Sequence, residues 1–267
     1  MPEGDTVYQT AARLRVLEGQ TLRHTDFRVP ALASADLTGG TVARVRSRGK
    51  HLLIDVTGEP PVAIHSHLLM EGAWDIHPTG QRWRRPGHSA RVILATEHYE
   101  AVGFSLGILE LLTDPAEVGT APGSVGAVLA HLGPDLLGDD WDADEAVRRL
   151  ATQSSVAVGL ALLDQRLLAG IGNVYRSEVC FLRGIAPTRP IGDVDVRALV
   201  DLAHRLLWAN RLRPARTTTG DTRRNARLWV YGRGGQSCRR CATPINRGEL
   251  GPPGRERVVY WCPRCQR

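Results

Sequence analysis

This chain of 267 residues contains a single lysine and no long apolar run. No run approaches the roughly 20 apolar residues of a membrane span, and the N-terminus has no apolar core of a secretion signal. The sequence also holds no internal repeat and no low-complexity tract. With 42% hydrophobic and 23% charged residues, it is typical of a globular protein. We therefore expect a soluble protein of a reducing, cytoplasmic compartment, with two ordinary domains or one large one.

Only one of the 34 basic residues is a lysine, Lys50, in the sequence Arg-Gly-Lys-His. A coding bias toward arginine explains the other basic residues but not this exception. Arginine is a planar fork that stays charged, whereas lysine is a compact amine whose pKa can move. The exception indicates a site that requires an amine, and drift is the alternative.

Cysteine is also scarce, and four of the five cysteines stand near the end of the chain, at Cys238, Cys241, Cys262 and Cys265. The two Cys-x2-Cys pairs can reach one tetrahedral zinc ion if the residues between them form a hairpin. Two disulfides are the alternative, but they need an oxidising compartment that nothing in the sequence indicates. The fifth cysteine, Cys180, lies in an apolar helical stretch and is expected to be a core residue.

Charge is distributed unevenly along the chain. Residues 211–267 hold fourteen arginines and three acidic residues, a net charge of +11, which leaves −5 on the rest. A basic block of this kind, with tryptophans and tyrosines among the arginines, is typical of a phosphate-binding surface. A solvated basic tail is the alternative, and the metal-site spacing inside the block weighs against it.

Apolar periodicity divides the chain into a strand-rich first half and a helical second half. Residues 6–18 have the pattern of an amphipathic helix that ends before Gly19. Short alternating runs at residues 21–29, 41–47, 51–56, 62–68, 91–96 and 100–106 predict an antiparallel sandwich or barrel. Residues 114–126 have the composition of a linker. After them, helices are expected at residues 146–150, 156–163, 174–182 and 194–208.

The N-terminus carries a possible nucleophile. The chain begins Met1-Pro2-Glu3-Gly4, and initiator methionine is commonly removed before proline. The exposed secondary amine would have a pKa near ~8, and its neutral form could attack an electrophilic carbon. Glu3 could move the proton that such a reaction requires. The alternative role of Pro2 is to begin a helix.

Two further motifs predict contacts with phosphate. Residues 169–173, Ala-Gly-Ile-Gly-Asn, precede a helix, where glycines allow close approach and free N–H groups favour an anion. No strand precedes them, so a helix–turn–helix grip on phosphate fits better than a nucleotide-cofactor site. His65 and His67 alternate on a predicted strand and could chelate a metal. No third ligand is evident, so hydrogen bonding to phosphate or to the protein is favoured.

Taken together, five motifs make the sequence resemble the formamidopyrimidine-DNA glycosylase and endonuclease VIII (Fpg/Nei) family from end to end. They are Met-Pro-Glu-Gly at the start, Ser-Arg-Gly-Lys, Ser-His-Leu, Leu-Leu-Asp-Gln followed by Ala-Gly-Ile-Gly-Asn-Val-Tyr, and Tyr-Trp-Cys-Pro-Arg-Cys-Gln at the close. The start Pro-Glu-Gly, in place of Pro-Glu-Leu-Pro-Glu, is similar to the endonuclease VIII branch.

The resemblance implies an α+β multidomain fold. Its parts are an N-terminal antiparallel β-sandwich domain with an N-terminal helix over residues 1–113, the linker 114–126, a helical domain with a helix–two-turn–helix over 127–220, and a four-cysteine zinc β-hairpin domain over 221–267. One structural Zn²⁺ is the implied cofactor. A cytoplasmic, nucleoid-associated monomer without membrane contact is also implied.

The function that the resemblance implies is that of a bifunctional DNA glycosylase and AP lyase of base excision repair. Its partner would be double-stranded DNA with an oxidised base or an abasic site. Pro2 would be the nucleophile at C1′ of the damaged nucleotide, and Glu3 the general acid/base. Lys50 and Arg257 would hold phosphate beside the lesion and assist the chemistry, and Asn173 would grip the DNA backbone. Elimination on both sides of the sugar, β then δ, would cut the strand.

The resemblance also assigns residues that hold the distorted duplex. His67 would lie near the DNA backbone. Leu69 and Met70 would fill the gap left when the damaged nucleotide is extruded from the base stack. Two residues depart from the family pattern: Glu71 stands where endonuclease VIII has a tyrosine, and Thr6 replaces a second N-terminal glutamate.

Oxidised pyrimidines are the substrate class that the similarity to endonuclease VIII favours, and oxidised purines are the alternative. A non-catalytic, zinc-containing DNA-binding protein is the alternative from another class, but it has no need for Pro2, Glu3 and Lys50 together. A zinc hydrolase would need an open coordination position, which four cysteine ligands close.

Overall fold

The computed structural model describes residues 2–113, 115 and 120–267. Within them the chain forms two compact units: unit 1 is Pro2 with Thr6–His131, and unit 2 is Glu3–Asp5 with Leu132–Arg267. Met1, together with residues 114 and 116–119 of the predicted linker, lies outside the described residues. In the described part of the chain, no helix is long and apolar enough to cross a membrane.

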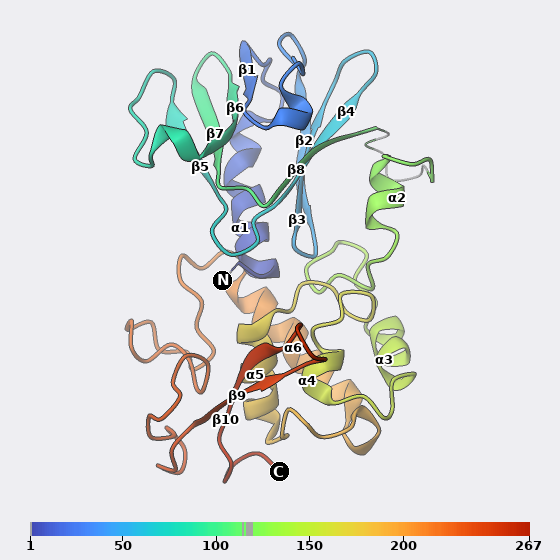
Figure 1. The fold of residues 1–267 in the computed structure, drawn as a ribbon, viewed down its shortest axis with the longest axis vertical. Coiled ribbons are helices and arrows are strands. Elements are labelled where there is room, and N and C mark those ends of the chain that lie inside the picture. The colour runs from blue at the N-terminus through green and yellow to red at the C-terminus, as the bar shows by residue number, and fades with distance from the viewer. Residues whose placement is uncertain (1, 114, 116–119) are drawn as a thin grey trace. The chain divides into compact units, whose positions relative to one another are not determined.

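Unit 1 is built on two antiparallel sheets (Figure 1). Its strands are β1 (His24–Phe27), β2 (Val42–Arg48), β3 (His51–Val56), β4 (Val62–His67), β5 (Ala73–Pro78), β6 (Ala90–Ala95), β7 (Tyr99–Phe104) and β8 (Ile108–Thr113). One sheet has the order β1-β6-β7-β5 and the other the order β2-β3-β4-β8. Of the two folds that the strand pattern allowed, the structure is the sandwich.

The first helix, α1 (Gly4–Leu14), packs into the core of the sandwich. Its residues Val7, Ala11 and Leu14 are almost inaccessible to solvent, as the apolar periodicity predicted. A short 3₁₀ helix (Arg15–Leu17) continues it, and Gly19 follows with a φ of +77°. Both sheets add apolar side chains to the same core, among them Val45, Leu52, Ile54, Ile64, Trp74, Val92, Leu94 and Ala101.

Two of the strands were not predicted. The strands β5 and β8 each lie at the end of a sheet, where a strand pairs on one side only. The β5 sequence, Ala-Trp-Asp-Ile-His-Pro, carries two large apolar residues, and the β8 sequence, Ile-Leu-Glu-Leu-Leu-Thr, is too continuously apolar to show a period of two. A short helix, α2 (Val125–Leu129), begins within the predicted linker and is capped by Ser124, whose Oγ accepts the Ala127 N–H.

Unit 2 contains the helices that the second half of the sequence predicts. They are α3 (Ala143–Ala151), α4 (Val158–Ala161), α5 (Asn173–Arg183) and α6 (Val196–Asn210). The Asp142 carboxylate caps α3 by accepting two backbone N–H groups, and Asp195 caps α6 by accepting one, from Ala198. Further 3₁₀ turns are Pro30–Leu32, Gly87–Ser89 and Ile191–Asp193.

The chain closes with a hairpin between the two cysteine pairs, as predicted. Its strands, β9 (Asn246–Leu250) and β10 (Arg257–Trp261), are antiparallel, and β10 packs on α5 (Figure 1). Beneath the hairpin, Phe181 stacks on Trp229 with ring centroids 5.4 Å apart. Cys180 is fully buried, and burial raises the pKa of its thiol to about 12, so the predicted core cysteine is an unreactive one.

Candidate functional site

Glu3 is fully buried and docks onto the N-terminus of α5. Its carboxylate accepts backbone N–H groups from Gly172 (2.8 Å), Val174 (2.7 Å) and Tyr175 (3.3 Å). These donors are the ones that a helix start leaves without partners inside the helix, and the helix dipole favours an anion there. The turn that the sequence predicted to bind an anion therefore holds the chain's own carboxylate.

The glycines of this turn are required by the close approach of the N-terminal segment. A Cβ on Gly172 would lie 2.6 Å from the Glu3 Cδ, so any side chain there would displace the carboxylate. Gly170 has a φ of +108°, which L side chains rarely adopt, and its carbonyl accepts the N–H of Gly4 at 2.8 Å. The Ala-Gly-Ile-Gly-Asn turn is thus shaped around residues 3 and 4.

A mostly buried arginine, Arg216, completes the surroundings of Glu3. The guanidinium of Arg216 donates to both carboxylate oxygens of Asp5 and lies 3.8 Å from the Glu3 carboxylate. Burial acts against the charge of Arg216, but Glu3 and Asp5 outweigh it and raise the arginine's pKa. Tyr175 donates its hydroxyl to Asp5 at 2.9 Å, and burial together with the Asp5 charge raises the pKa of the phenol. Two buried acids and one mostly buried, permanent cation are therefore held together here.

Asn173 is the first residue of α5 and is 8% exposed. Arg257 begins β10 and is exposed. The fully buried Arg176 of α5 connects the two elements, because its guanidinium donates to the carbonyls of Arg257 (3.3 Å) and Val258 (2.7 Å). Burial lowers the pKa of Arg176 to about 10. The helix start and the hairpin strand that carry the two predicted phosphate ligands are therefore held together.

In unit 1, Lys50 lies in the two-residue turn between β2 and β3, where Arg48 pairs with His51. Gly49 has a φ of +57°, the conformation that a type II′ hairpin turn needs at its first central position. His67 ends β4 and lies directly across from His51 in the sheet register. The charge of Lys50 contributes to lowering the pKa of both histidines, so the predicted Lys50 and His67 lie within electrostatic reach of each other.

Leu69 and Met70, the predicted wedge, are among the few large apolar side chains that are exposed, at 49% and 60%. They lie in the turn after β4, where Leu69 has a φ of +48° and donates its N–H to Nδ1 of His67 at 3.0 Å. Glu71, the departure from the family pattern, is exposed beside them. An exposed apolar pair in a strained turn fits a role outside the core.

The four cysteines of the predicted metal site come together as the spacing requires. Their sulfur atoms all lie within 4.8 Å of one another, with Cys238 and Cys265 at 3.9 Å and Cys241 and Cys262 at 3.5 Å. A tetrahedral zinc ion with Zn–S bonds of about 2.3 Å places its sulfurs about 3.8 Å apart. The four thiols therefore fit a metal ion of that size. Among the described residues, they are the one group of three or more cysteine, histidine or carboxylate ligands that could hold a metal ion.

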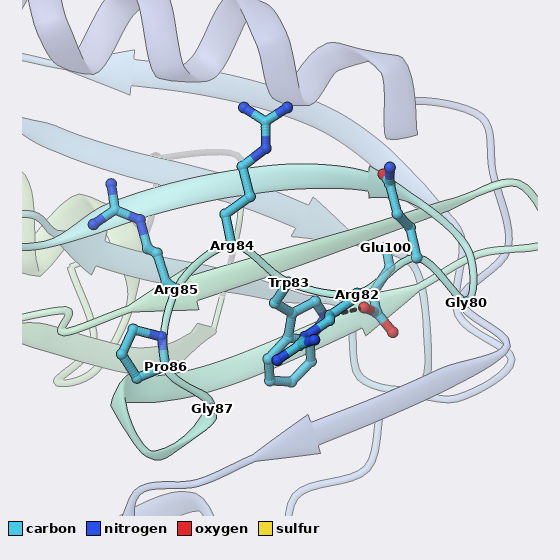
Figure 2. A pocket seen from close by; sticks show the side chains of 9 residues that line it. Gly80, Arg82, Trp83, Arg84, Arg85, Pro86, Gly87 and Glu100 are labelled. Atoms are coloured by element: carbon cyan, nitrogen blue, oxygen red, sulfur yellow. Dashed lines mark hydrogen bonds between the residues drawn. The ribbon is translucent and has the colours of Figure 1, made fainter.

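The structure also contains two basic hollows. In unit 2, a cavity of about 780 Å³ is lined by Arg216, Arg224, Arg227, Arg233 and Tyr231 among others. In unit 1, a second one of about 640 Å³ follows the loop between β5 and β6 (Figure 2). There Trp83 donates its indole N–H to Glu100, and the neighbouring arginines 82, 84 and 85 are exposed. Neither hollow was predicted as a site.

The predicted site residues fall into two groups. Glu3, Asn173 and Arg257 belong to unit 2, where one helix, α5, contacts the segments that carry all three. Lys50, His67, Leu69 and Met70 belong to unit 1, around the ends of β3 and β4. Pro2 is half-buried and precedes Glu3 directly.

Sequence reasoning missed Asp5, Arg176 and Arg216. Each is a buried or, for Arg216, mostly buried charged residue that supports a predicted one, either by ion pairing beside Glu3 or by holding the strand of Arg257. Arg216 is one of fourteen arginines in the basic block, and nothing in the sequence distinguishes the one that turns inward. The position of Asp5, two residues after Glu3, was the one available signal.

Comparison with protein families gives two matches. Residues 1–105 match the formamidopyrimidine-DNA glycosylase N-terminal domain, and residues 132–208 match the formamidopyrimidine-DNA glycosylase H2TH domain. Endonuclease 8 2 of Mycobacterium bovis is 51% identical over 100% of both chains. DNA-(apurinic or apyrimidinic site) lyase Nei2 of Mycolicibacterium smegmatis is 50% identical over 100% of this chain and 99% of its own.

Solved structures agree on the fold. A complex between the LlFpg protein, a THF-DNA and an inhibitor aligns over 100% of both chains with a TM-score of 0.80 and 23% identity. A Lactococcus lactis Fpg complex with DNA containing an oxidised pyrimidine has the same TM-score and identity. The chain belongs to the formamidopyrimidine-DNA glycosylase family, on its endonuclease VIII-like branch.

Proposed function

We propose that the protein is a bifunctional DNA glycosylase and AP lyase of base excision repair. The observation that carries the proposal is the buried Glu3 carboxylate, held by three backbone N–H groups directly after a proline whose amine becomes N-terminal once Met1 is removed. A carboxylate fixed in this way can act on protons at a sugar bound to its neighbour. The family match and the 51% identical endonuclease 8 2 support the same activity.

In the proposed reaction the Pro2 nitrogen forms a bond to C1′ of the damaged nucleotide. The C1′–N glycosidic bond breaks, and the base leaves with the electron pair and receives a proton. The proline nitrogen then loses its proton, and its lone pair expels O4′, which takes up a proton, so that the sugar ring opens to an iminium at C1′. The iminium makes the C2′ proton acidic; its removal, assigned to Glu3, expels the 3′ phosphate by β-elimination, and δ-elimination then expels the 5′ phosphate. Water hydrolyses the iminium and releases Pro2.

Four polar side chains would hold the DNA around this reaction. Asn173 and Arg257 offer an amide and a guanidinium to backbone phosphate, and α5 supports both. Lys50 and His67 offer an ammonium and an imidazole from the β2–β3 turn and the end of β4. Such contacts fix the register of the duplex without reading its sequence. Leu69 and Met70, exposed and apolar, would enter the stack where the nucleotide is extruded.

Oxidised pyrimidines are the proposed substrate class. The Pro-Glu-Gly start and the similarity to endonuclease 8 2 support this choice. Oxidised purines remain the alternative, because another relative, 33% identical over 90% of this chain, is a formamidopyrimidine-DNA glycosylase of Methylococcus capsulatus. The basic cavity beside Arg216 is the proposed place for the extruded nucleotide.

Zinc is the proposed metal of the four-cysteine site. Four thiolates close the coordination sphere, so the ion would be structural and would fix the hairpin that carries Arg257. Its removal should weaken DNA binding first and catalysis as a consequence.

A lesion panel on defined duplexes tests the proposal. Oligonucleotides with an oxidised pyrimidine, an oxidised purine, an abasic site or no damage are incubated with the mature protein, and strand cleavage is followed on denaturing gels. The proposal expects cleavage of abasic and oxidised-pyrimidine strands to products with phosphates at both ends. Binding to all four duplexes without cleavage of any would favour the non-catalytic alternative.

A further inference from the structure

The β2-β3-β4-β8 sheet carries a row of ionisable side chains on one face, near the turn that holds Lys50. The register pairs His51 with His67 and His65 with Glu110, and alternate residues of β4 point to the same face. Nδ1 of His51 lies 2.9 Å from Nε2 of His65, and Nδ1 of His65 lies 3.3 Å from the Glu110 carboxylate. Three side chains on three strands therefore form one hydrogen-bonded chain.

This row of hydrogen bonds, from Glu110 through His65 to His51, leads from solvent to the β2–β3 turn. The Glu110 side chain is 51% exposed, whereas that of His65 is 2% exposed. His51, at the inner end, directly follows Lys50 in the sequence. His131, which follows α2, covers the same end, with its ring centroid 6.1 Å from that of His51. A buried histidine with both ring nitrogens bonded has a fixed orientation and a fixed tautomer.

The Glu110 carboxylate determines which ring nitrogen of His65 and of His51 carries the proton. An ionised carboxylate only accepts, so Nδ1 of His65 carries the proton and its Nε2 is an acceptor. Nδ1 of His51 must then donate to that Nε2, which leaves the lone pair of His51 on its own Nε2. Among the described residues, this nitrogen has no hydrogen-bond partner, and it lies at the Lys50 end of the row.

His67 has the opposite tautomer. Its Nδ1 accepts the backbone N–H of Leu69 at 3.0 Å, so the neutral ring carries its proton on Nε2. The two neighbouring rings, whose centroids are 5.2 Å apart, therefore differ: His67 offers a donor and His51 an acceptor. A phosphate oxygen can accept from His67, but only a donor can satisfy His51.

Both rings stay uncharged at neutral pH. Burial lowers the pKa of His51 to about 3, and the charges of His65, His67, His131 and Lys50 act in the same direction. Burial and then the charge of Lys50 lower the pKa of His67 to about 4. Burial also lowers the pKa of His65, against the effect of Glu110. A cation at this turn thus has to come from Lys50 rather than from an imidazolium.

We propose that His51, held by His65 and Glu110, is a positioning residue that accepts a hydrogen bond from the Lys50 ammonium and aims its remaining protons at a DNA phosphate. An ammonium has three donors, so it can bind His51 and a phosphate at the same time. This inference rests on the proposed role of Lys50 in the glycosylase reaction. Nothing in that role by itself requires His51, His65 or Glu110.

The hydrogen-bonded row Glu110–His65–His51, called the relay below, should have a measurable effect on the pKa of Lys50. An acceptor beside an ammonium favours the charged form, so the relay raises the pKa of Lys50. If the His65 link is lost, the His51 ring can turn or move its proton to Nε2, which then faces the ammonium as a second donor. The Lys50 pKa should then fall by about one unit, the usual scale for losing one such interaction.

Lys50 is the single lysine of the chain, so protein labelled with ¹³C-lysine gives one side-chain ε-carbon signal to titrate. Two variants are compared with the wild type. His65→Leu removes the hydrogen bond between His65 and His51. Glu110→Gln changes the exposed end of the row and tests the inference even if the buried substitution His65→Leu prevents folding. His98→Gln, at an exposed histidine in the turn between β6 and β7 of the other sheet, is the matched control. His65→Gln is the rescue variant, because its amide oxygen can replace the Nε2 acceptor.

The expected result is a Lys50 pKa lower by about one unit in His65→Leu, a smaller decrease in Glu110→Gln, recovery in His65→Gln and no change in His98→Gln. In the same variants, the decrease in the rate of abasic-site cleavage at alkaline pH should shift to lower pH by a similar amount. An unchanged Lys50 pKa in both His65→Leu and Glu110→Gln, or ¹⁵N spectra of the wild type that place the His51 proton on Nε2, would overturn the relay. A relay confirmed by titration in a protein that cleaves no lesion would instead refute the proposed function.

Discussion

Replacing Glu3 by glutamine tests the arrangement at the start of α5 most sharply. The wild-type carboxylate accepts N–H groups with both oxygens: Oε2 from Gly172 and Tyr175, and Oε1 from Val174. An amide has one oxygen, so glutamine can keep the contacts of only one of the two carboxylate oxygens. At the position of the other oxygen, its NH₂ group faces backbone N–H donors and cannot accept from them. It also removes the negative charge 3.8 Å from Arg216.

The cost follows from these contacts. Leaving one buried N–H without an acceptor costs about 1–3 kcal/mol. Removing one partner of a buried charge network costs about 3–5 kcal/mol, but Asp5 keeps its two hydrogen bonds to Arg216 and limits that loss. Together these effects predict that the free energy of unfolding of unit 2 falls by about 3 kcal/mol.

Urea unfolding followed by tryptophan fluorescence measures this change, because Trp229 reports on unit 2. Glu249→Gln, an exposed glutamate of β9, is the matched control and should unfold like the wild type. If Glu3→Gln unfolds at the same urea concentration as both, the three N–H contacts do not hold the N-terminal segment in solution. The turn would then have to be regarded as a site for an external anion.

Further predictions concern the turn, the lysine, the metal and pH. Gly172→Ala should displace the Glu3 side chain and abolish strand cleavage while the fold is retained, as seen by circular dichroism; normal cleavage rates would contradict the contact of 2.6 Å. Lys50→Arg keeps the charge, so cleavage should fall by far more than DNA affinity in parallel gel and anisotropy assays; equal turnover would make the lone lysine an accident. A chelator that strips the four-cysteine site should reduce affinity for an abasic duplex before it affects helix content, and added zinc should restore it. Because His51 and His67 have folded-state pKa values of about 3 and about 4, below the ordinary 6.5, the unfolded chain binds more protons as the pH falls from 6.5. Unit 1 should therefore lose about 2–3 kcal/mol of stability between pH 7 and pH 5, after allowing for solvent screening of these half-buried rings, and stability independent of pH over this range would contradict their burial.

The sequence predicted the local and repetitive features well, for physical reasons. The cysteine spacing determined the metal site, and the apolar periods located α1 and the helices of unit 2 to within a few residues. The edge strands β5 and β8 were missed because a strand paired on one side can dispense with a clear period of two. The turn before α5 was predicted to grip phosphate, but N–H groups at the start of the helix bind the carboxylate of Glu3, some 170 residues away in sequence.

The missed residues share one property. Asp5, Arg176 and Arg216 act through partners distant in the chain, and Glu110 supports His65 from another strand. A charged residue looks the same in sequence whether it faces solvent or a buried partner. Only the fold brings such partners together, so motif reasoning found the residues proposed to touch DNA and not those that hold them.

The covalent bond between protein and substrate shows directly whether the Pro2 nitrogen is the nucleophile. The mature protein is incubated with an abasic-site duplex and borohydride, and the trapped adduct is digested and sequenced by mass spectrometry. We expect one adduct, on the nitrogen of Pro2, in protein that has lost Met1, and a correctly processed Pro2→Gly protein should trap and cleave far more slowly. An adduct on Lys50, or equal trapping by Pro2→Gly, would contradict this role of Pro2.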